Sequence, residues 1–75
     1  MKLQKNDRVE FLTDFDVYPH ATISEGARGI IINVNKIIIK LDVEVDGLED
    51  WDNEVYLGDY IENQLDLLPK IIKII

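Results

Sequence analysis

The sequence predicts an all-β protein: a single small barrel of about five short antiparallel strands with one helical turn near the C-terminus. Two observations favour this class. Hydrophobic residues make up 47% of the chain, with isoleucine the most frequent, and turn-forming residues recur at short intervals between them. About four to six short strands are too few for an ordinary sandwich but enough to curl into one barrel. We therefore expect residues 1–75 to form one domain.

The N-terminal third is expected to supply the first strands. Asp7–Thr13 alternates apolar and polar residues and predicts the opening strand. Asp14–His20 is interpreted as a loop, because Pro19 has no amide hydrogen to donate. Ala21–Ile23 predicts a short strand or its lead-in. Ser24–Gly29 predicts a turn, in which either glycine can adopt positive φ at little steric cost.

A β-hairpin is the clearest local pattern in the chain. Gly29–Val34 predicts its first strand, Asn33–Lys36 a tight turn, and Ile37–Val45 the antiparallel second strand. Positions 41, 43 and 45 of the second strand are apolar and alternate with acidic residues, which predicts one buried and one solvated face.

The C-terminal third is less regular. Asp46–Asp50 is interpreted as a loop and Trp51–Leu57 as a further strand. Tyr60–Leu68 is interpreted as one turn of helix followed by a short extended piece, because Pro69 is expected to stop a helix. Lys70–Ile75 predicts the last strand.

The order of these segments is similar to that of the SH3-like small barrels. The segments that carry the resemblance are DRVEFL, GARGIIINV, IIIKLD, DWDNEVYL and DLLP, which together cover most of Asp7–Ile75. Similar arrangements occur in KOW-type domains, in a small accessory subunit of photosystem I and in the variable chain of ferredoxin–thioredoxin reductase. The chain resembles most closely small uncharacterised bacterial and phage proteins. The resemblance implies the SH3-like barrel fold, and that fold hosts many functions.

Acidic residues are concentrated in Asp42–Glu54, which contains seven of them and no lysine or arginine. The whole chain carries a net charge of −7, and its eight lysines and arginines are scattered. Phosphate backbones are bound by clustered basic residues, so we expect no direct binding of nucleic acid. The expected partner is instead a protein with a basic surface.

The chain lacks the features of exported or membrane-spanning proteins. It has no cysteine, which removes disulfides and thiol chemistry and agrees with a reducing compartment. No apolar run approaches the ~20 residues of a membrane helix, and the N-terminus has no signal-peptide core. We therefore expect a cytoplasmic protein that does not bind membranes.

Motifs for metals and catalysis are incomplete. Asp42–Gly47 is similar to the start of a calcium loop, but the position that should supply a bidentate Glu is Asn53. His20 is the only histidine, and it has Asp14 and Asp16 nearby but no Ser or Thr in a recognisable catalytic setting. We predict no enzymatic activity, no cofactor and no metal.

The predicted binding surface combines the Asp14–His20 loop with the acidic segment. Carboxylates would steer a basic partner, and Tyr18, Trp51 or Tyr60 would anchor it. Two alternatives remain open: Trp51 packs into the core, and the acidic face only aids solubility. The candidate partner-binding residues are Asp14, Asp16, Tyr18, His20, Asp46, Glu49, Asp50, Trp51, Asp52, Glu54 and Tyr60.

Two more specific functions use the same chemistry. A phage-encoded inhibitor of the anti-CRISPR or anti-restriction type would place its carboxylates in the nucleic-acid-binding site of a defence nuclease. The photosynthetic barrels imply a small subunit or assembly factor of a redox complex. In either case, the isoleucine-rich strand Lys70–Ile75 can pair with a second copy of the chain and form a homo-oligomer.

Overall fold

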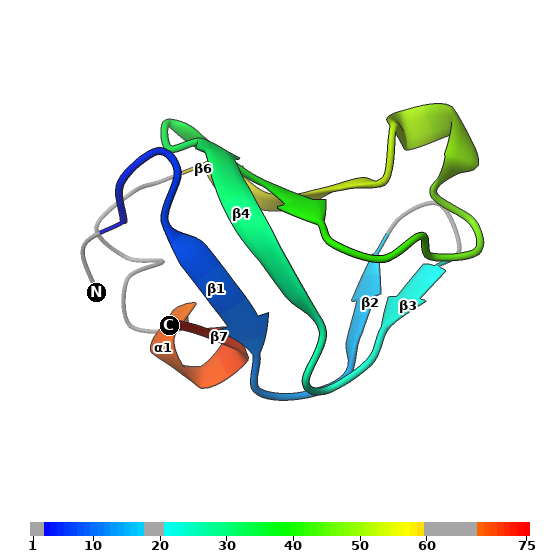
Figure 1. Cartoon of the computed structure of the whole chain (residues 1–75), viewed down its shortest axis with the longest axis horizontal. Coiled ribbons are helices and arrows are strands. Elements are labelled where there is room, and N and C mark those ends of the chain that lie inside the picture. Colours follow the sequence, from blue (N-terminus) through cyan, green and yellow to red (C-terminus); the bar gives the residue numbers. More distant parts are fainter. Residues whose placement is uncertain (1–2, 18–20, 60–67) are drawn as a thin grey trace.

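The secondary structure is almost entirely β in the computed structural model, which describes residues 3–17, 21–59 and 68–75 (Figure 1). The predicted all-β class with one α-helical turn near the C-terminus is confirmed within these residues. The elements are, in chain order, β1 Arg8–Phe11, β2 Phe15–Val17, β3 Ala21–Ile23, β4 Arg28–Asn33, β5 Lys36–Leu41, the 3₁₀ turn η1 Glu49–Trp51, β6 Glu54–Asp59, α1 Leu68–Ile71 and β7 Ile72–Ile74.

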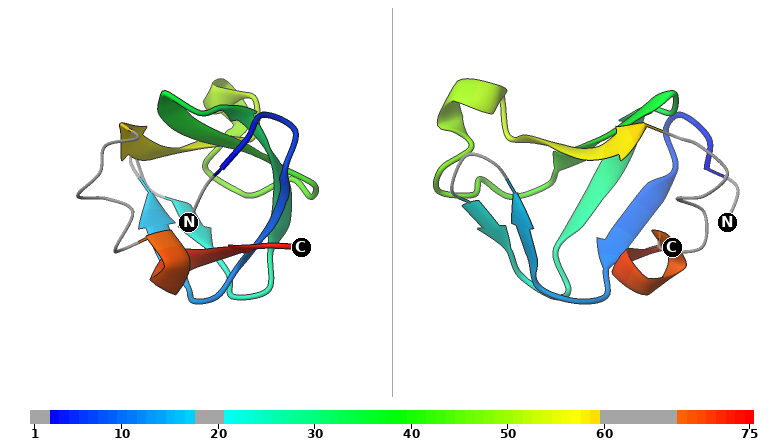
Figure 2. Two further views of the ribbon diagram at one scale, coloured as in Figure 1. Left: turned by 90° about the vertical axis from the view of Figure 1, so that its left-hand side faces the viewer. Right: turned by 180° about the vertical axis from the view of Figure 1, so that it is seen from behind.

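The strands form two antiparallel sheets. Five strands make one sheet in the order β6-β5-β4-β1-β7, and β2 pairs with β3 in a separate hairpin. The larger sheet is strongly curved, as both views in Figure 2 show. No strand pairing joins the two sheets in the described part of the chain. A fully closed SH3-like barrel therefore stays a prediction.

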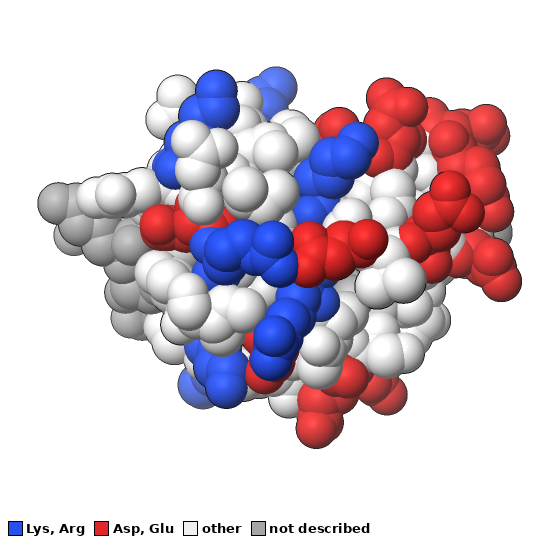
Figure 3. All heavy atoms as spheres, in the orientation of Figure 1, with Lys and Arg blue, Asp and Glu red and all other residues white. Residues whose placement is uncertain are grey.

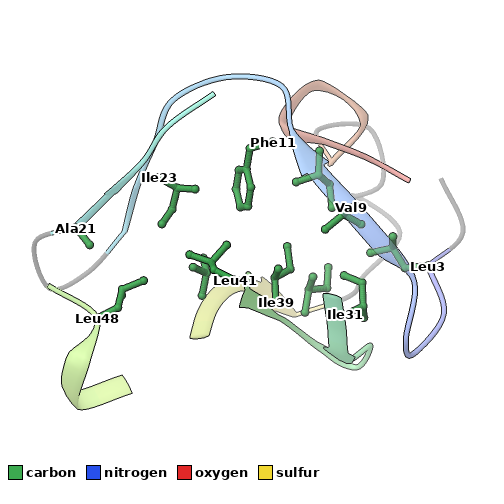
Figure 4. Packing of buried hydrophobic residues seen from close by; sticks show 12 residues of the cluster. Leu3, Val9, Phe11, Ala21, Ile23, Ile31, Ile39, Leu41 and Leu48 are labelled. Atoms are coloured by element: carbon green, nitrogen blue, oxygen red, sulfur yellow. The ribbon is translucent and has the colours of Figure 1, made fainter. Parts of the chain in front are cut away.

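The core lies between the curved sheet and the hairpin, and both supply its side chains (Figure 4). Phe11 of β1 points into this space, and its ring centroid lies 6.1 Å from that of Phe15 in β2. Leu48, from the segment between β5 and β6, lies at the end of the core near Ala21. The buried cluster consists of Leu3, Val9, Phe11, Ala21, Ile23, Ile31, Ile37, Ile39, Leu41, Leu48, Val55 and Ile72.

The predicted central hairpin is confirmed, with β4 and β5 joined by a turn at positions 34 and 35. Gly26, before β4, and Gly29, near the start of β4, have different roles. Gly26 has a φ of 91° and supplies the left-handed turn. Gly29 does not adopt positive φ; a Cβ there would lie 2.6 Å from both Ile39 Cγ2 and the carbonyl oxygen of Lys40. Gly29 therefore allows β4 and β5 to approach closely.

The N-terminal predictions are partly confirmed. The opening strand and the short strand at Ala21–Ile23 are present as β1 and β3. The prediction that Asp14–His20 is a loop is wrong for Phe15–Val17, because these three residues form β2 and pair with β3. Its two apolar side chains pack against the core, while Asp16 is exposed between them. Positions 18–20 lie outside the described residues.

The two strands that flank the acidic segment are shorter than predicted. The strand predicted at Ile37–Val45 ends earlier, at Leu41, where β5 ends. The strand predicted at Trp51–Leu57 begins later, at Glu54, where β6 begins. Val43, which was expected in the core, is 67% exposed. The cause is a set of hydrogen bonds across the intervening loop, described below.

The structure around Pro69 differs from the prediction for the C-terminal segment. This proline lies inside the short helix α1 rather than after a helix, because the first turn of a helix does not need the missing amide hydrogen. The last strand is shorter than Lys70–Ile75 and forms an edge of the large sheet. Ile74 and Ile75 are exposed there, and pairing with a second copy stays a prediction. The helical turn predicted at positions 60–67 lies outside the described residues.

Glu10 connects three strands across the outer face of the large sheet. It lies opposite Arg28 of β4 and Lys73 of β7. Its Oε1 accepts a hydrogen bond of 2.9 Å from Arg28 Nε, and its Oε2 lies 3.4 Å from Lys73 Nζ. The hydrogen bond from Arg28 first, and then that from Lys73, lower the pKa of Glu10 below its ordinary value of 4.5.

This lowered pKa predicts how Glu10→Gln changes the pH dependence of stability. A carboxyl with a lowered pKa stabilises the fold above its ordinary pKa, and the contribution is lost as the pH falls through the lowered value. In urea denaturation, we expect Glu10→Gln to be less stable than the wild type at neutral pH. The difference should shrink as the pH falls below 4.5. Glu25→Gln, an exposed change outside this network, is the control, and an equal response from both variants would contradict the prediction.

Candidate protein-binding surface

The acidic loop, residues 42–53 between β5 and β6, extends beyond the large sheet on the side of the β2–β3 hairpin (Figure 1). Leu48 anchors it, because its side chain is only 1% exposed and packs into the core. The carbonyl of Leu48 also accepts hydrogen bonds from the amides of Trp51 at 3.0 Å and Asn53 at 3.1 Å. One buried residue thus fixes the middle of a loop that is otherwise mostly exposed.

Asn53 joins the two ends of the acidic loop. Its side-chain Nδ2 donates to the carbonyls of Leu41 at 3.2 Å and Val43 at 2.8 Å, and its Oδ1 accepts from the amide of Val45 at 2.9 Å. Its main-chain carbonyl accepts from the amide of Leu41 at 3.1 Å. Its φ of 61° is left-handed, a conformation that asparagine tolerates better than most residues. These contacts take Val43 and Val45 out of the strand pattern.

The carboxylates of the loop differ in what they contact. Asp42 forms an ion pair with Arg8, and Glu49 Oε2 accepts a hydrogen bond of 3.1 Å from the amide of Gly47. The ion pairs of the described residues involve only Asp42 and Glu10 as acids. The exposed carboxylates without a basic partner in that set include the predicted residues Asp46, Glu49, Asp50 and Asp52.

Charge is separated across the visible face of the molecule. Figure 3 shows acidic side chains gathered over the end that carries the acidic loop, with most basic side chains over the sheet and toward the other end. Two basic residues reach the loop: Arg8 pairs with Asp42 at its start, and Lys40 Nζ donates to the main-chain carbonyl of Asp52 at 3.2 Å. The carboxylates of the loop therefore form one acidic surface.

A groove of about 420 Å³ lies beside the acidic loop. Trp51 is 50% exposed and lines it, so the interpretation of Trp51 as a core residue is wrong. The neighbouring Asp52 and Asn53 are both left-handed, which turns the chain sharply after η1, and Leu48 supplies the buried anchor instead. The groove is lined by Val17, Lys36, Ile38, Trp51, Glu54, Val55 and Tyr56.

The remaining predicted residues are only partly brought to this surface. Glu54 begins β6 and lines the groove. Asp14 Oδ1 accepts a hydrogen bond of 2.8 Å from the amide of Glu25, at the end of the hairpin away from the acidic loop (Figure 1). Asp16 accepts one of 2.9 Å from Thr22 within the hairpin. The candidates Tyr18, His20 and Tyr60 lie outside the described residues.

Sequence reasoning missed the groove residue Ile38 and the connecting role of Asn53, whereas Tyr56 is one of the aromatic residues that it considers for a recognition patch with Trp51. Ile38 lies opposite Tyr56 in the sheet, between the buried residues Ile37 and Ile39. Because all three residues of this run are isoleucine, the sequence gives no alternation that marks Ile38 as outward-facing. The sequence indicates the role of Asn53 only weakly, through the tolerance of asparagine for left-handed backbone geometry.

Within residues 3–17, 21–59 and 68–75, no group of three or more metal-ligating side chains is arranged to hold a metal ion. The helices of the described chain are all too short to span a bilayer. No protein-family model, curated protein or solved structure matches the chain. The SH3-like resemblance stays a prediction, and function is inferred from this chain's own geometry.

The hydrogen bonds of Asn53 predict a large effect of Asn53→Asp. The carboxylate keeps the acceptor for Val45 but loses both donated bonds and faces two carbonyl oxygens. We expect a loss of about 2–4 kcal/mol in the free energy of unfolding, measured by urea denaturation. Asn33→Asp is the matched control, because the side chain of Asn33 accepts a hydrogen bond through its Oδ1, 3.0 Å from the amide of Lys36, and a carboxylate keeps that acceptor. Similar losses in the two variants would contradict this role of Asn53.

The surroundings of Trp51 predict how ions quench its fluorescence. It is the only tryptophan, half-exposed, and follows Glu49 and Asp50 in the acidic loop. Negative potential concentrates cations and repels anions near the ring. Relative to each ion's quenching of free N-acetyltryptophanamide, we expect caesium to quench Trp51 about twice as efficiently as iodide at low ionic strength. The difference should shrink in concentrated sodium chloride. Equal quenching by the two ions at low salt would contradict a negative potential at this site.

Proposed function

We propose that this chain is a non-enzymatic binding module whose acidic loop engages a basic surface of another protein. The observation that carries the proposal is the group of exposed carboxylates of Asp46, Glu49, Asp50 and Asp52, which have no basic partner among the ion pairs of the described residues. Like charges held together repel one another, and a positively charged partner removes that repulsion. Such complementarity speeds association and excludes partners of the wrong charge.

Two features favour binding over a purely solubilising role. Solubility requires charge but no fixed loop, whereas Leu48 and Asn53 hold this loop in one conformation. Solubility is also not improved by a half-exposed tryptophan, and Trp51 lies among the carboxylates. Tryptophan is one of the residues enriched at the hot spots of protein interfaces.

The proposed partner is recognised by its lysines and arginines. A basic channel of a defence nuclease and a basic subunit of a redox complex both have this chemistry, so the inhibitor and the redox subunit are special cases of the proposal. The identity of the captured protein discriminates between them. The proposal assigns no catalytic residue.

A pair of charge reversals tests the proposal. Asp50→Lys lies in the acidic loop and Glu25→Lys in the turn before β4, and each changes the net charge by the same amount. Immobilised variants would be incubated with a lysate of the source organism, and the retained proteins quantified by mass spectrometry. We expect Asp50→Lys to reduce recovery of a basic partner about tenfold and Glu25→Lys to leave it nearly unchanged.

Salt and folding provide the controls. Recovery by the wild type should fall as ionic strength rises, because contacts between exposed charges are screened. Both variants should unfold at nearly the same urea concentration as the wild type. Equal recovery by the two variants would contradict a role for the acidic loop.

A further inference from the structure

The groove beside the acidic loop combines apolar, aromatic and acidic side chains on one face. In β5 and β6, Ile38 lies opposite Tyr56 and Lys40 opposite Glu54. Residues two apart on a strand point to the same side, so Glu54 and Tyr56 are neighbours on the outer face. Trp51 reaches the groove from η1. The groove therefore places two exposed aromatic side chains next to a carboxylate.

The volume of the groove suits more than one side chain. Its value of about 420 Å³ falls within the range of roughly 300–1,000 Å³ for ligand pockets. Val17 and Ile38 give it an apolar part, against which the methylene groups of a long basic side chain can pack. A short extended peptide segment with one basic and one apolar side chain fits this combination.

At each end of the groove a lysine of β5 lies opposite an acidic residue of β6. Lys36 lies opposite Asp59 in the sheet, whereas Glu54 lies opposite Lys40, four residues farther along β5. This spacing corresponds to roughly 13 Å along a strand. Among the residues that line the groove, Glu54 is the acidic one and lies next to the acidic loop. It is therefore the position in the groove for a positive side chain of the partner.

We infer that this groove binds an arginine of the basic partner in preference to lysine. The flat guanidinium group can stack on an aromatic ring and donate two parallel hydrogen bonds to a carboxylate at the same time. A lysine ammonium is more strongly hydrated and lacks this planar, two-pronged geometry. The groove offers both elements in Trp51 or Tyr56 and Glu54. This inference rests on the proposed function, because it names the side chain that the surface selects.

The test uses two synthetic peptides of equal charge. One is an amidated hexapeptide of alternating leucine and arginine, and the other has lysine in place of arginine. Trp51 is the only tryptophan and lines the groove, so its fluorescence reports binding directly. We expect the arginine peptide to bind the wild-type protein roughly three- to tenfold more tightly than the lysine peptide.

Two variants separate the groove from the general negative field. Glu54→Gln removes the carboxylate in the groove, whereas Glu44→Gln removes an exposed carboxylate of the acidic loop outside it. We expect Glu54→Gln to reduce the preference for arginine to about one. Glu44→Gln should weaken both peptides equally and preserve the preference, since a distant charge does not distinguish two cations.

The outcomes distinguish this inference from the proposed function. Equal affinity of the wild type for the two peptides overturns the arginine inference without requiring any variant to fold. If partner recovery still falls with Asp50→Lys, the proposed function survives that result. The inference is supported if Glu54→Gln abolishes the preference for arginine and Glu44→Gln preserves it. That support holds even if Asp50→Lys leaves partner recovery unchanged, a result that would remove the proposed role of the acidic loop.

Discussion

The acidic surface depends on the hydrogen bonds that the side-chain amide group of Asn53 makes across the loop. Exposed carboxylates repel one another, by about 1 kcal/mol for a pair about 4 Å apart in water, and the acidic loop carries several exposed carboxylates. Its order therefore requires compensating interactions. Burial of Leu48 contributes roughly 1.5–3 kcal/mol, and each hydrogen bond of Asn53 about 1 kcal/mol. These contributions are of the size needed to offset the repulsion between a few exposed pairs.

The same contacts determine which apolar residue faces water. Leu48 occupies the core, and the left-handed conformations of Asp52 and Asn53 redirect the chain between η1 and β6. Trp51 is consequently left on the surface beside the groove. An exposed aromatic next to carboxylates is thus a consequence of how the loop is held, and the surface proposed for binding is formed by the interactions that stabilise it.

Sequence patterns predicted the parts of this fold that depend on neighbouring residues. The alternation in β1 and the turn between β4 and β5 are local features and were recognised. The end of β5 was not, because the alternation up to Val45 looks like a strand and is interrupted by Asn53, which lies at least eight residues farther along. β2 was missed because its three residues are too few to show a period. The acidic residues were evident from composition, but the groove depends on β2 lying near β6.

The distribution of basic residues explains why the acidic surface stays uncompensated. Arg28 and Lys73 are engaged by Glu10 on the large sheet, and Arg8 by Asp42 at the start of the loop. Their charges are satisfied locally, so they contribute little field at the far end of the loop. In the function that we propose, long-range attraction and short-range selection would belong to different parts of the molecule. The outer carboxylates would speed the arrival of a basic partner, and the groove beside Trp51 would select which of its side chains is retained.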